Sequence, residues 1–353
     1  MRASVVSGLA SAARHGVLVK GGEFLELPAR LTGLAIDKTG TLTSGRPVVS
    51  QVLPMDEHTA PGLLAVAASI ESRSEHPLAA AIVSHARAEG VELRQAGNVR
   101  ALPGQGVSGE LDGTTYWLGS HRFLEARGQE TLAVHETLER LEADGHTVVV
   151  LGNDRHVCGL ITLRDEPRPE AARVVAELHA LGLRPIAMLT GDNRATGRVI
   201  GERLGIDDVR AELLPEDKLA AVEALVAEHG AMAMVGDGVN DAPALARSSL
   251  GVAMGGAGTA AAIETADVVI LSDDLTRLPW LVRHSRRTLG VIRQNIVASL
   301  AIKALFILLA LGGWSTLWGA IAADMGVSLL VVSNALRLLR DPSAAGPANG
   351  SRG

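Results

Sequence analysis

Hydrophobic and polar positions follow different spacings in different parts of this chain, and each spacing predicts its own kind of element. From Val157 to residue 271, short apolar runs alternate with longer amphipathic stretches, which is typical of βαβ units and a parallel sheet. The apolar run 34–36, just before Asp37, has the character of a parallel strand that is buried on both faces. We therefore expect an α/β fold with a doubly wound parallel sheet, which the strand at 34–36 joins.

The pattern between these two regions is mixed. It predicts helices at 61–70, 77–89 and 131–143 and strands around 107–118 and 147–151. Such a mixture is expected for an inserted α+β domain, which we assign to residues 47–157. Residues 23–46 and 158–285 would then form the parallel-sheet domain on either side of the insertion.

Two apolar runs near the C-terminus predict membrane helices. Residues 296–313 and 319–336 each comprise 18 residues and contain a single charge, Lys303 in the first and Asp324 in the second. A helix that crosses a bilayer of ~30 Å needs about 20 residues, so each run with its flanks is long enough. We expect two transmembrane helices within 290–338, although a buried helix pair in a soluble protein is the alternative.

The residues around these runs indicate an orientation. Arginines precede and follow the pair, and by the positive-inside rule both ends are cytoplasmic, which makes a helical hairpin; they are Arg286, Arg287, Arg293, Arg337 and Arg340. Trp314 and Trp318 lie in or near the short connector, where tryptophan is favoured at the membrane interface. A multi-pass protein of the cell membrane with its large domains in the cytoplasm is expected.

Both ends of the chain carry weaker signals. Residues 1–22 lack the continuous apolar stretch of a signal peptide and are interpreted as the cytoplasmic end of a membrane helix. The segment 341–353 is rich in Gly, Pro, Ser and Ala and is expected to be disordered.

Composition narrows the possible partners. A net charge of −6 and an aromatic content of 2% provide neither a basic patch nor stacking side chains, so no nucleic-acid partner is expected. The single cysteine, Cys158, excludes an internal disulfide and fits a reducing compartment. Because it lies in an apolar run, we interpret it as a buried structural thiol.

Polar residues follow three of the predicted strands at their C-terminal ends. Asp37 ends the first strand, Thr190 follows the apolar start of "AMLTGD" (187–192), and Asp237 and Asp241 follow that of "AMVGDGVND" (233–241). Strand ends of a doubly wound sheet meet at one crevice, where such folds place their ligands. Lys218 stands near a predicted helix start in the same region.

These residue types predict phosphoryl transfer to a carboxylate. Asp37 and Asp237 would repel each other unless a cation lies between them, and oxygen ligands beside a phosphate suit Mg²⁺. Lys218 can balance phosphate charge, and the Thr190 hydroxyl can bind a phosphoryl oxygen. Asp37 would then attack the phosphate and form an aspartyl-phosphate.

The string "DKTGTLT" (37–43), followed in order by "TGD" (190–192) and "GDGVND" (236–241), resembles the P-type ATPases of the haloacid-dehalogenase superfamily. The resemblance extends over about residues 1 to 340. It implies a haloacid-dehalogenase-like fold in which ATP phosphorylates Asp37. It further implies that Asp37, the Thr39 carbonyl and Asp237 hold Mg²⁺. Asp241 is then a catalytic residue, and Gly191 and Asp192 are cofactor-binding residues.

Position 39 argues against the main rival, a phosphatase. In this resemblance, phosphatases of the superfamily are recognised by an acidic residue two places after the nucleophile. That acidic residue serves as the general acid/base. This chain has Thr39 there. Threonine does not activate water, so the phosphorylated enzyme should persist.

The inserted domain resembles the nucleotide-binding domain of heavy-metal-transporting P-type ATPases in the strings "ESRSEHPLA" (71–79), "GQGV" (104–107) and "LGN" (151–153). The resemblance implies a set of residues that line the adenine and ribose site, namely Glu71, His76, Gly104, Gly106, Gly152 and Asn153. For His76 and Pro77 a plain helix start is the alternative, because proline is favoured at the first helical position.

The membrane hairpin resembles the zinc/cadmium/lead branch in "IRQN…K" and "ADMG…NALRLL". A charge at membrane depth costs roughly 2.5–3.5 kcal/mol, which makes it a functional candidate. The resemblance implies Asp324 as a ligand of the transported Zn²⁺, Cd²⁺ or Pb²⁺ and Lys303 as its counter-charge. A purely structural ion pair is the alternative. The patterns expected of the copper and cobalt branches are not found in these helices.

Two family features are missing from the printed sequence. A Cys-Pro-Cys motif is expected in the helix just upstream, and a Thr-Gly-Glu string marks the actuator domain. We therefore interpret the chain as the C-terminal part of an ATP-driven metal exporter, which needs its N-terminal half for transport. A membrane-anchored nucleotide-binding or regulatory module is the second hypothesis, and a haloacid-dehalogenase-type phosphatase is the third.

Overall fold

The structure is a computed structural model that describes residues 2–74, 76–102, 105–237, 241–255, 264–313 and 317–340. It divides into two compact units. One comprises residues 1–34, 176–184 and 222–353, and the other comprises residues 35–175 and 185–221. The predicted disordered tail, 341–353, and Trp314 lie outside the described residues.

A seven-stranded sheet carries the predicted site residues. Its order is β1-β13-β12-β11-β2-β9-β10, so the three strands expected to bear the site, β11, β2 and β9, are neighbours. β9 and β10 pair in parallel, as do β11, β12 and β13, whereas β1 closes the edge antiparallel to β13. The strands are β1 Val17–Val19, β2 Gly33–Asp37, β9 Ile186–Leu189, β10 Asp208–Arg210, β11 Met232–Gly236, β12 Leu250–Met254 and β13 Val268–Ile270. The predicted α/β sheet is confirmed.

Helices alternate with these strands as the sequence predicts. They are α7 Ala171–Ala180, α8 Arg194–Leu204, α9 Pro215–His229 and α10 Ala242–Arg247. Helix α8 illustrates the local signals. Asn193 caps its N-terminus by accepting a hydrogen bond from the Thr196 N–H, and Gly205 ends it in the left-handed conformation.

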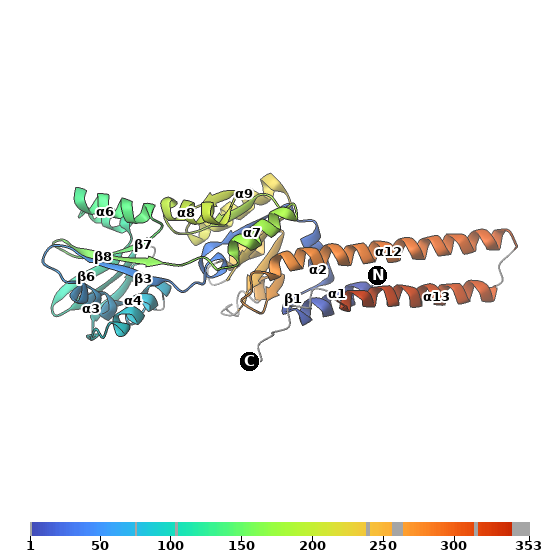
Figure 1. Cartoon of the computed structure of the whole chain (residues 1–353), viewed down its shortest axis with the longest axis horizontal. Helices are drawn as coiled ribbons and strands as arrows, with labels where there is room; N and C mark the ends of the chain where they lie inside the picture. The colour runs from blue at the N-terminus through green and yellow to red at the C-terminus, as the bar shows by residue number, and fades with distance from the viewer. Residues whose placement is uncertain are drawn as a thin grey trace, which may run out of the picture. The chain divides into compact units, whose positions relative to one another are not determined.

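The inserted domain contains a six-stranded antiparallel sheet of order β3-β8-β7-β6-β5-β4 (Figure 1). Its strands are β3 Val48–Pro54, β4 Gly97–Leu102, β5 Gly106–Leu111, β6 Thr114–Gly119, β7 Thr147–Asn153 and β8 Val157–Arg164. The predicted strands around 107–118 and 147–151 are confirmed as β5, β6 and β7. β3 and β4 were not predicted from the sequence, because their exposed and half-buried residues give weak apolar runs.

The expectation that the run at 157–163 opens the parallel sheet is wrong. This run is β8, which pairs antiparallel with both β3 and β7. The reason is that helices cover both faces of this sheet, so β8 is apolar on both sides and resembles a parallel strand in sequence. A boundary of the inserted domain at 157 would separate β8 from its own sheet.

Helices pack on both faces of the six-stranded sheet (Figure 1). α3 Ala60–Glu71 and α4 Pro77–Ala88 bury one apolar cluster, and α5 His121–Arg127 and α6 Leu132–Ala143 bury the other. The predicted helices at 61–70, 77–89 and 131–143 are confirmed as α3, α4 and α6. Cys158 is a buried free thiol in the first cluster, as expected, and its burial raises its pKa to about 11.

The unit that comprises residues 1–34, 176–184 and 222–353 contains the two apolar helices (Figure 1). They are α12 Arg277–Leu311 and α13 Leu317–Leu336. Both are long and apolar enough to cross a membrane. Their contact includes a hydrogen bond of 2.8 Å from Asn334 Nδ2 to Asn295 Oδ1. α1 Arg2–Arg14 packs beside them, since Asn295 Nδ2 also donates to Ser4 Oγ at 3.0 Å.

α12 begins earlier than the start expected near residue 290. Its first turns are buried, with Leu278, Trp280 and Leu281 packed into the protein, while residues such as Leu300 and Leu308 are exposed. The apolar run therefore marks only the half of the helix that leaves the folded domain. The first half of α12 was not predicted, because its apolar residues alternate with polar ones and form no continuous apolar run.

Candidate functional site

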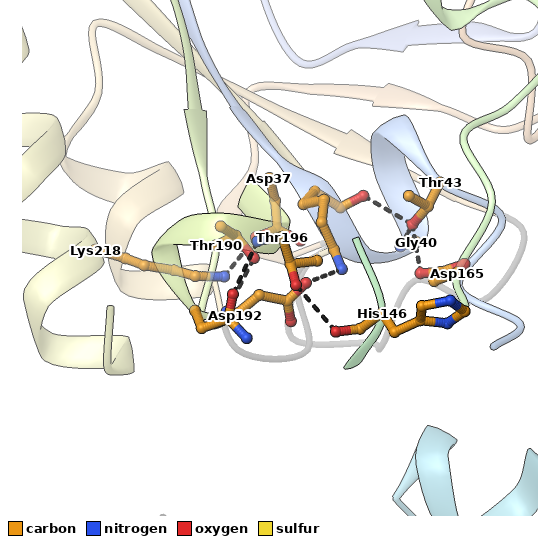
Figure 2. Close-up of polar contacts among 11 residues, drawn as sticks. Asp37, Gly40, Thr43, His146, Asp165, Thr190, Asp192, Thr196 and Lys218 are labelled. Atoms are coloured by element: carbon orange, nitrogen blue, oxygen red, sulfur yellow. Dashed lines mark hydrogen bonds and ion pairs between the residues drawn. The ribbon is translucent and has the colours of Figure 1, made fainter. Parts of the chain in front are cut away.

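The phosphorylation site expected from the sequence centres on Asp37, the last residue of β2. All five residues of this strand are buried, and Asp37 is only 4% exposed. Lys218, in the first turn of α9, donates a hydrogen bond from Nζ to Asp37 Oδ1 at 2.5 Å (Figure 2). A buried carboxylate without a cation is strongly disfavoured, and Lys218 supplies the counter-charge that Asp37 needs at this strand end.

The loop after Asp37 is a single wide turn over residues 38–42. Gly40 takes a φ of 75°, which a side chain would disfavour, and the Thr43 N–H donates to the Lys38 carbonyl at 3.0 Å to close the turn. Arg168 holds the loop from outside. Its Nε donates to the carbonyls of Thr41 and Thr43 at 2.8 and 3.1 Å, and its Nη2 donates to the Gly40 carbonyl at 3.1 Å.

Arg168 was not predicted from the sequence. Arg168 acts through hydrogen bonds to backbone carbonyls that are 125 to 128 positions away in the sequence. No sequence motif indicates such contacts. The guanidinium group is suited to this task because its donors lie in one rigid plane. We assign Arg168 as a positioning residue for the loop that carries the nucleophile.

Thr43 and Asp165 form a second polar contact beneath the loop (Figure 2). The Thr43 hydroxyl donates to Asp165 Oδ2 at 2.5 Å, and it lies 3.0 Å from the Lys38 carbonyl. Burial raises the pKa of Asp165, although the Thr43 hydroxyl and the charge of Lys38 act in the opposite direction. Asp165 directly follows β8, so this hydrogen bond connects the loop to the C-terminal end of that strand.

Thr190 and Asp192 lie after β9, the other neighbour of β2. The Asp192 N–H donates to Thr190 Oγ1 at 3.1 Å, and Lys38 Nζ makes an ion pair with Asp192 Oδ2. Lys38 is 3% exposed and was not predicted as a site residue, since a lysine beside an aspartate in a loop is common. The structure thus brings two buried lysines, Lys38 and Lys218, to the residues around Asp37.

Asp237 and Asp241 follow β11. Asp241 is buried and stands at the N-terminus of α10. Gly236 makes this possible, because a Cβ at that position would lie 2.6 Å from Asp241 Oδ2. Asp237 comes directly after the strand, as the sequence indicates, and residues 238–240 lie outside the described part of the chain.

The side chains and carbonyls at this site fit Mg²⁺ and a phosphate chain. Asp37, the Thr39 carbonyl and Asp237 offer oxygen atoms only, which is the ligand chemistry that Mg²⁺ prefers. Two buried ammonium groups and the Thr190 hydroxyl suit an anionic phosphate chain. Asp192 is already paired with Lys38, so its carboxylate orients that lysine.

Glu71 and His76 lie on either side of the connection between α3 and α4. Glu71 lines a surface pocket of about 300 Å³ with Ser74, Val83 and Arg87 among its other walls. Burial raises the pKa of the Glu71 carboxyl, although a hydrogen bond with Ser74 opposes the shift. His76 caps α4, because its Nδ1 accepts from the Leu78 N–H at 3.2 Å, and desolvation lowers its pKa. His76 is therefore the N-cap of α4, as the helix-start interpretation expects, and its place in the nucleotide site stays a prediction.

The glycine positions of the expected nucleotide site have packing roles. A Cβ on Gly106 would lie 1.9 Å from the Leu118 carbonyl oxygen, and one on Gly152 would lie 2.4 Å from Trp117 Cζ2. Asn153 is buried, and its Oδ1 accepts from the N–H groups of Arg155 and His156 at 2.8 and 3.0 Å. These contacts shape the β7–β8 turn. Gly104 lies outside the described residues.

Lys303 and Asp324 pair between the two apolar helices, as the sequence predicts. Lys303 Nζ lies 3.4 Å from Asp324 Oδ1. Both residues line a shallow pocket of about 240 Å³ together with Ile302, Phe306, Ala323 and Val327. Among the described residues that line this pocket, only these two are polar.

The fold and this site define an α/β phosphoryl-transfer protein with an inserted domain and two apolar C-terminal helices. Residues 31–248 match the family of haloacid dehalogenase-like hydrolases. A probable cadmium-transporting ATPase of Staphylococcus aureus (strain MRSA252) is 44% identical over 342 residues, which is 96% of this chain and 47% of that protein. The chain belongs to the haloacid dehalogenase-like hydrolases, and over 96% of its length it is similar to P-type ATPases.

Other relatives agree with this assignment. A manganese-exporting P-type ATPase of Mycobacterium bovis is 42% identical over 96% of this chain and 47% of that protein. Among solved structures, a zinc-transporting PIB-type ATPase in its E2.Pi state aligns with a TM-score of 0.75 and 41% identity, covering 96% of this chain and 55% of that one. The chain spans about half the length of the curated relatives it matches.

Proposed function

We propose that this chain carries the phosphorylation and nucleotide-binding machinery of an ATP-driven exporter of a divalent heavy metal. The observation that supports this most is the buried pair of Asp37 and Lys218, at the end of the strand that bears the signature string. An Asp37 oxygen attacks the γ-phosphorus of ATP, a new O–P bond forms, and the bond to the leaving β-phosphate oxygen breaks to release ADP.

The surrounding residues act on this step through charge and position. Lys218 and Thr190 neutralise and bind the phosphoryl oxygens, and Gly191 lets the backbone approach them closely. Mg²⁺, held by Asp37, the Thr39 carbonyl and Asp237, would shield the negative charges of the carboxylate and the phosphate from each other. Asp241 is buried at the N-terminus of α10 and follows the same strand, β11, as Asp237.

For the nucleotide, we propose a site in the inserted domain that is lined by residues of its three motif strings. Glu71 and its pocket support this proposal, and the other members are His76, Gly104, Gly106, Gly152 and Asn153. The domain then comprises residues 47–164, which keeps β8 with its sheet, and the phosphorylation domain comprises residues 23–46 and 165–285.

The transported ion is proposed from the relatives and from the apolar helices. Zn²⁺ or Cd²⁺ is favoured by the zinc- and cadmium-transporting relatives, with Pb²⁺ as the third member of that branch. Mn²⁺ is the second candidate, because one group of relatives is named for manganese export and a carboxylate is a hard ligand that suits it. Asp324 would bind the ion and Lys303 would be its counter-charge when the site is empty.

We further propose a multi-pass protein of the cell membrane whose catalytic domains face the cytoplasm. The arginines around the two apolar helices support this orientation. An N-terminal half, carrying an actuator domain and further helices, is proposed as the partner in transport. If the purified chain alone carried metal into vesicles in an ATP-dependent manner, this part of the proposal would be wrong.

Thr39 separates the exporter from the third hypothesis, a phosphatase. Replacing Thr39 with aspartate supplies a general base beside the aspartyl-phosphate, so its hydrolysis should accelerate by about 100-fold or more. Thr39→Val is the matched control and should leave the lifetime of the phosphorylated enzyme unchanged. Rapid turnover of generic phosphate esters by the unmodified chain would instead favour the phosphatase.

A further inference from the structure

Three metal-ligating side chains meet in the inserted domain, on elements that the proposed reaction does not use. His58 lies between β3 and α3, His156 in the turn between β7 and β8, and Cys158 on β8 itself. The Nε2 atoms of the two histidines are 2.9 Å apart, and His156 Nε2 is 4.0 Å from the Cys158 Sγ. All three ligand atoms lie within 4.8 Å of one another.

The arrangement is close to that of a tetrahedral metal centre. With metal–nitrogen bonds of 2.0–2.1 Å and a metal–sulfur bond of 2.3 Å, tetrahedral ligands stand about 3.3 Å apart for two nitrogens and about 3.6 Å apart for nitrogen and sulfur. The two separations that involve His156 Nε2 differ from these by about 0.4 Å each, and the third, between His58 and Cys158, is within 4.8 Å. Small rotations of two half-buried imidazoles would therefore complete the geometry.

The ligand types point to a soft or borderline cation. Two imidazole nitrogens and one thiol suit Zn²⁺ and Cd²⁺ better than Mg²⁺ or Mn²⁺, which prefer oxygen. Another imidazole cluster of the inserted domain, His121 and His135 around Glu130, is accounted for by ion pairs at 2.5 and 3.0 Å. In contrast, the Nε2 atoms of His58 and His156 face each other, and His156 Nε2 also faces the Cys158 thiol.

We propose that His58, His156 and Cys158 form a binding site for Zn²⁺ or Cd²⁺ in the inserted domain, separate from the ion site between the apolar helices. Binding converts the Cys158 thiol to a thiolate and releases its proton to solvent. Three protein ligands leave the fourth coordination position of a tetrahedral centre to water. Because the thiol is buried and the imidazoles are partly exposed, the metal enters from the histidine side.

The metal site directly contacts Asn153, a residue of the proposed nucleotide site. Asn153 Nδ2 lies 3.6 Å from the Cys158 Sγ, and Asn153 Oδ1 accepts from the His156 N–H at 3.0 Å. A metal that fixes His156 and Cys158 also fixes Asn153 between them. Metal and nucleotide binding are then thermodynamically linked, each changing the affinity for the other by the same factor. This consequence alone rests on the proposed function.

The direct test is a Cd²⁺ titration of the purified full chain in detergent, followed by the ultraviolet charge-transfer band of cadmium–thiolate bonds. Cys158 is the chain's only cysteine, so the band reports this site alone. We expect it to saturate at one Cd²⁺ per chain. His58→Ala and His156→Ala should each raise the dissociation constant by more than about tenfold, the lower end of the loss caused by removing even a supporting residue.

Two matched variants complete the design. His135→Ala removes an imidazole from the ion-paired cluster, and Asp324→Asn alters the helix site, and neither should change the band. Thermal unfolding of each variant without metal checks that it is folded. Absence of the band in the folded chain, or equal Cd²⁺ affinity in the chain and in both His58→Ala and His156→Ala, would overturn the proposal. None of these readouts depends on phosphorylation, so failure here leaves the proposed function standing.

Discussion

Lys218 donates a hydrogen bond to Asp37 across 2.5 Å, and both side chains are buried. The pair connects the first turn of α9 to the end of β2, and its two residues are 181 positions apart in the sequence, with the whole inserted domain between them. A cation held beside the nucleophile keeps the carboxylate charged and lowers the repulsion that an incoming phosphate would meet. The same contact thus stabilises the Asp37 carboxylate and prepares it for the phosphate.

Replacing Lys218 with methionine removes this charge while keeping a long apolar stem. We expect phosphorylation of Asp37 by ATP to slow by about 100-fold or more, the usual effect of losing one donor that stabilises developing charge. Rapid-quench measurement of the phosphorylated enzyme tests this. Lys20→Met, at an exposed lysine that donates to the Glu264 carbonyl, is the control and should not change the rate. An unchanged rate in Lys218→Met would refute the assigned role.

Replacing Arg168 with glutamine removes the bonds that hold the loop at residues 40–43. Hydrogen bonds to charged groups contribute about 1.5–3 kcal/mol each, so the loop should lose its fixed geometry. We expect the phosphorylation rate to fall at least tenfold while the affinity for ATP stays the same. Arg203→Gln breaks only an exposed pair with Glu166 and should be neutral. A parallel loss of ATP affinity would show that Arg168 acts on the nucleotide instead.

Gly152→Ala tests whether this glycine is required for packing. The added Cβ would lie 2.4 Å from the ring of Trp117, which is buried and donates from Nε1 to the Asn153 carbonyl at 3.1 Å. Overpacking of this kind costs typically 1–3 kcal/mol, so thermal unfolding should shift downward even without nucleotide. Gly97→Ala, whose Cβ would lie 4.0 Å from the closest atom, is the control. Reduced ATP affinity at unchanged stability would indicate a direct nucleotide contact.

His121 makes the stability of the inserted domain depend on pH. Burial alone would lower its pKa, but hydrogen bonds to Glu130 and Glu142 and the charges of both raise the pKa above its ordinary value. Its stabilisation is therefore complete below the unfolded pKa of about 6.5 and is lost as pH rises through the folded value. We expect His121→Gln to lower the unfolding temperature more at pH 6 than at pH 9.

The size of this effect is limited, because the pair is partly exposed, and we expect it to be within about 1 kcal/mol. Glu130→Gln provides the matched background, in which the difference between the two pH values should shrink. An equal loss at both pH values would mean that His121 stabilises the domain through packing and not through its charge.

The alternating pattern of apolar runs and helices predicts the parallel sheet well, because its central strands, such as β2 and β11, are buried on both faces. It fails for β8, which is buried on both faces of an antiparallel sheet and so has the same pattern. It also fails for the first half of α12, which is amphipathic and packs on the folded domain. In both cases the outcome depends on which elements pack against the strand or helix. The spacing of apolar residues does not contain that information.

The site follows a similar division. Asp37, Thr190 and Lys218 could be found because each stands at an element end with a motif around it. Lys38 and Arg168 could not, because their roles depend on pairing with Asp192 and with distant carbonyls. The cluster of His58, His156 and Cys158 was missed for the same reason, since nearly one hundred residues separate its first two members.

The central claim is that ATP phosphorylates Asp37. The most direct measurement is incorporation of label from γ-labelled ATP and Mg²⁺ into the purified chain, quenched in acid, beside the variant Asp37→Asn. The account predicts an acid-stable, hydroxylamine-sensitive label that is absent from the variant. A folded, ATP-binding chain that takes up no label, or equal labelling of chain and variant, would contradict it.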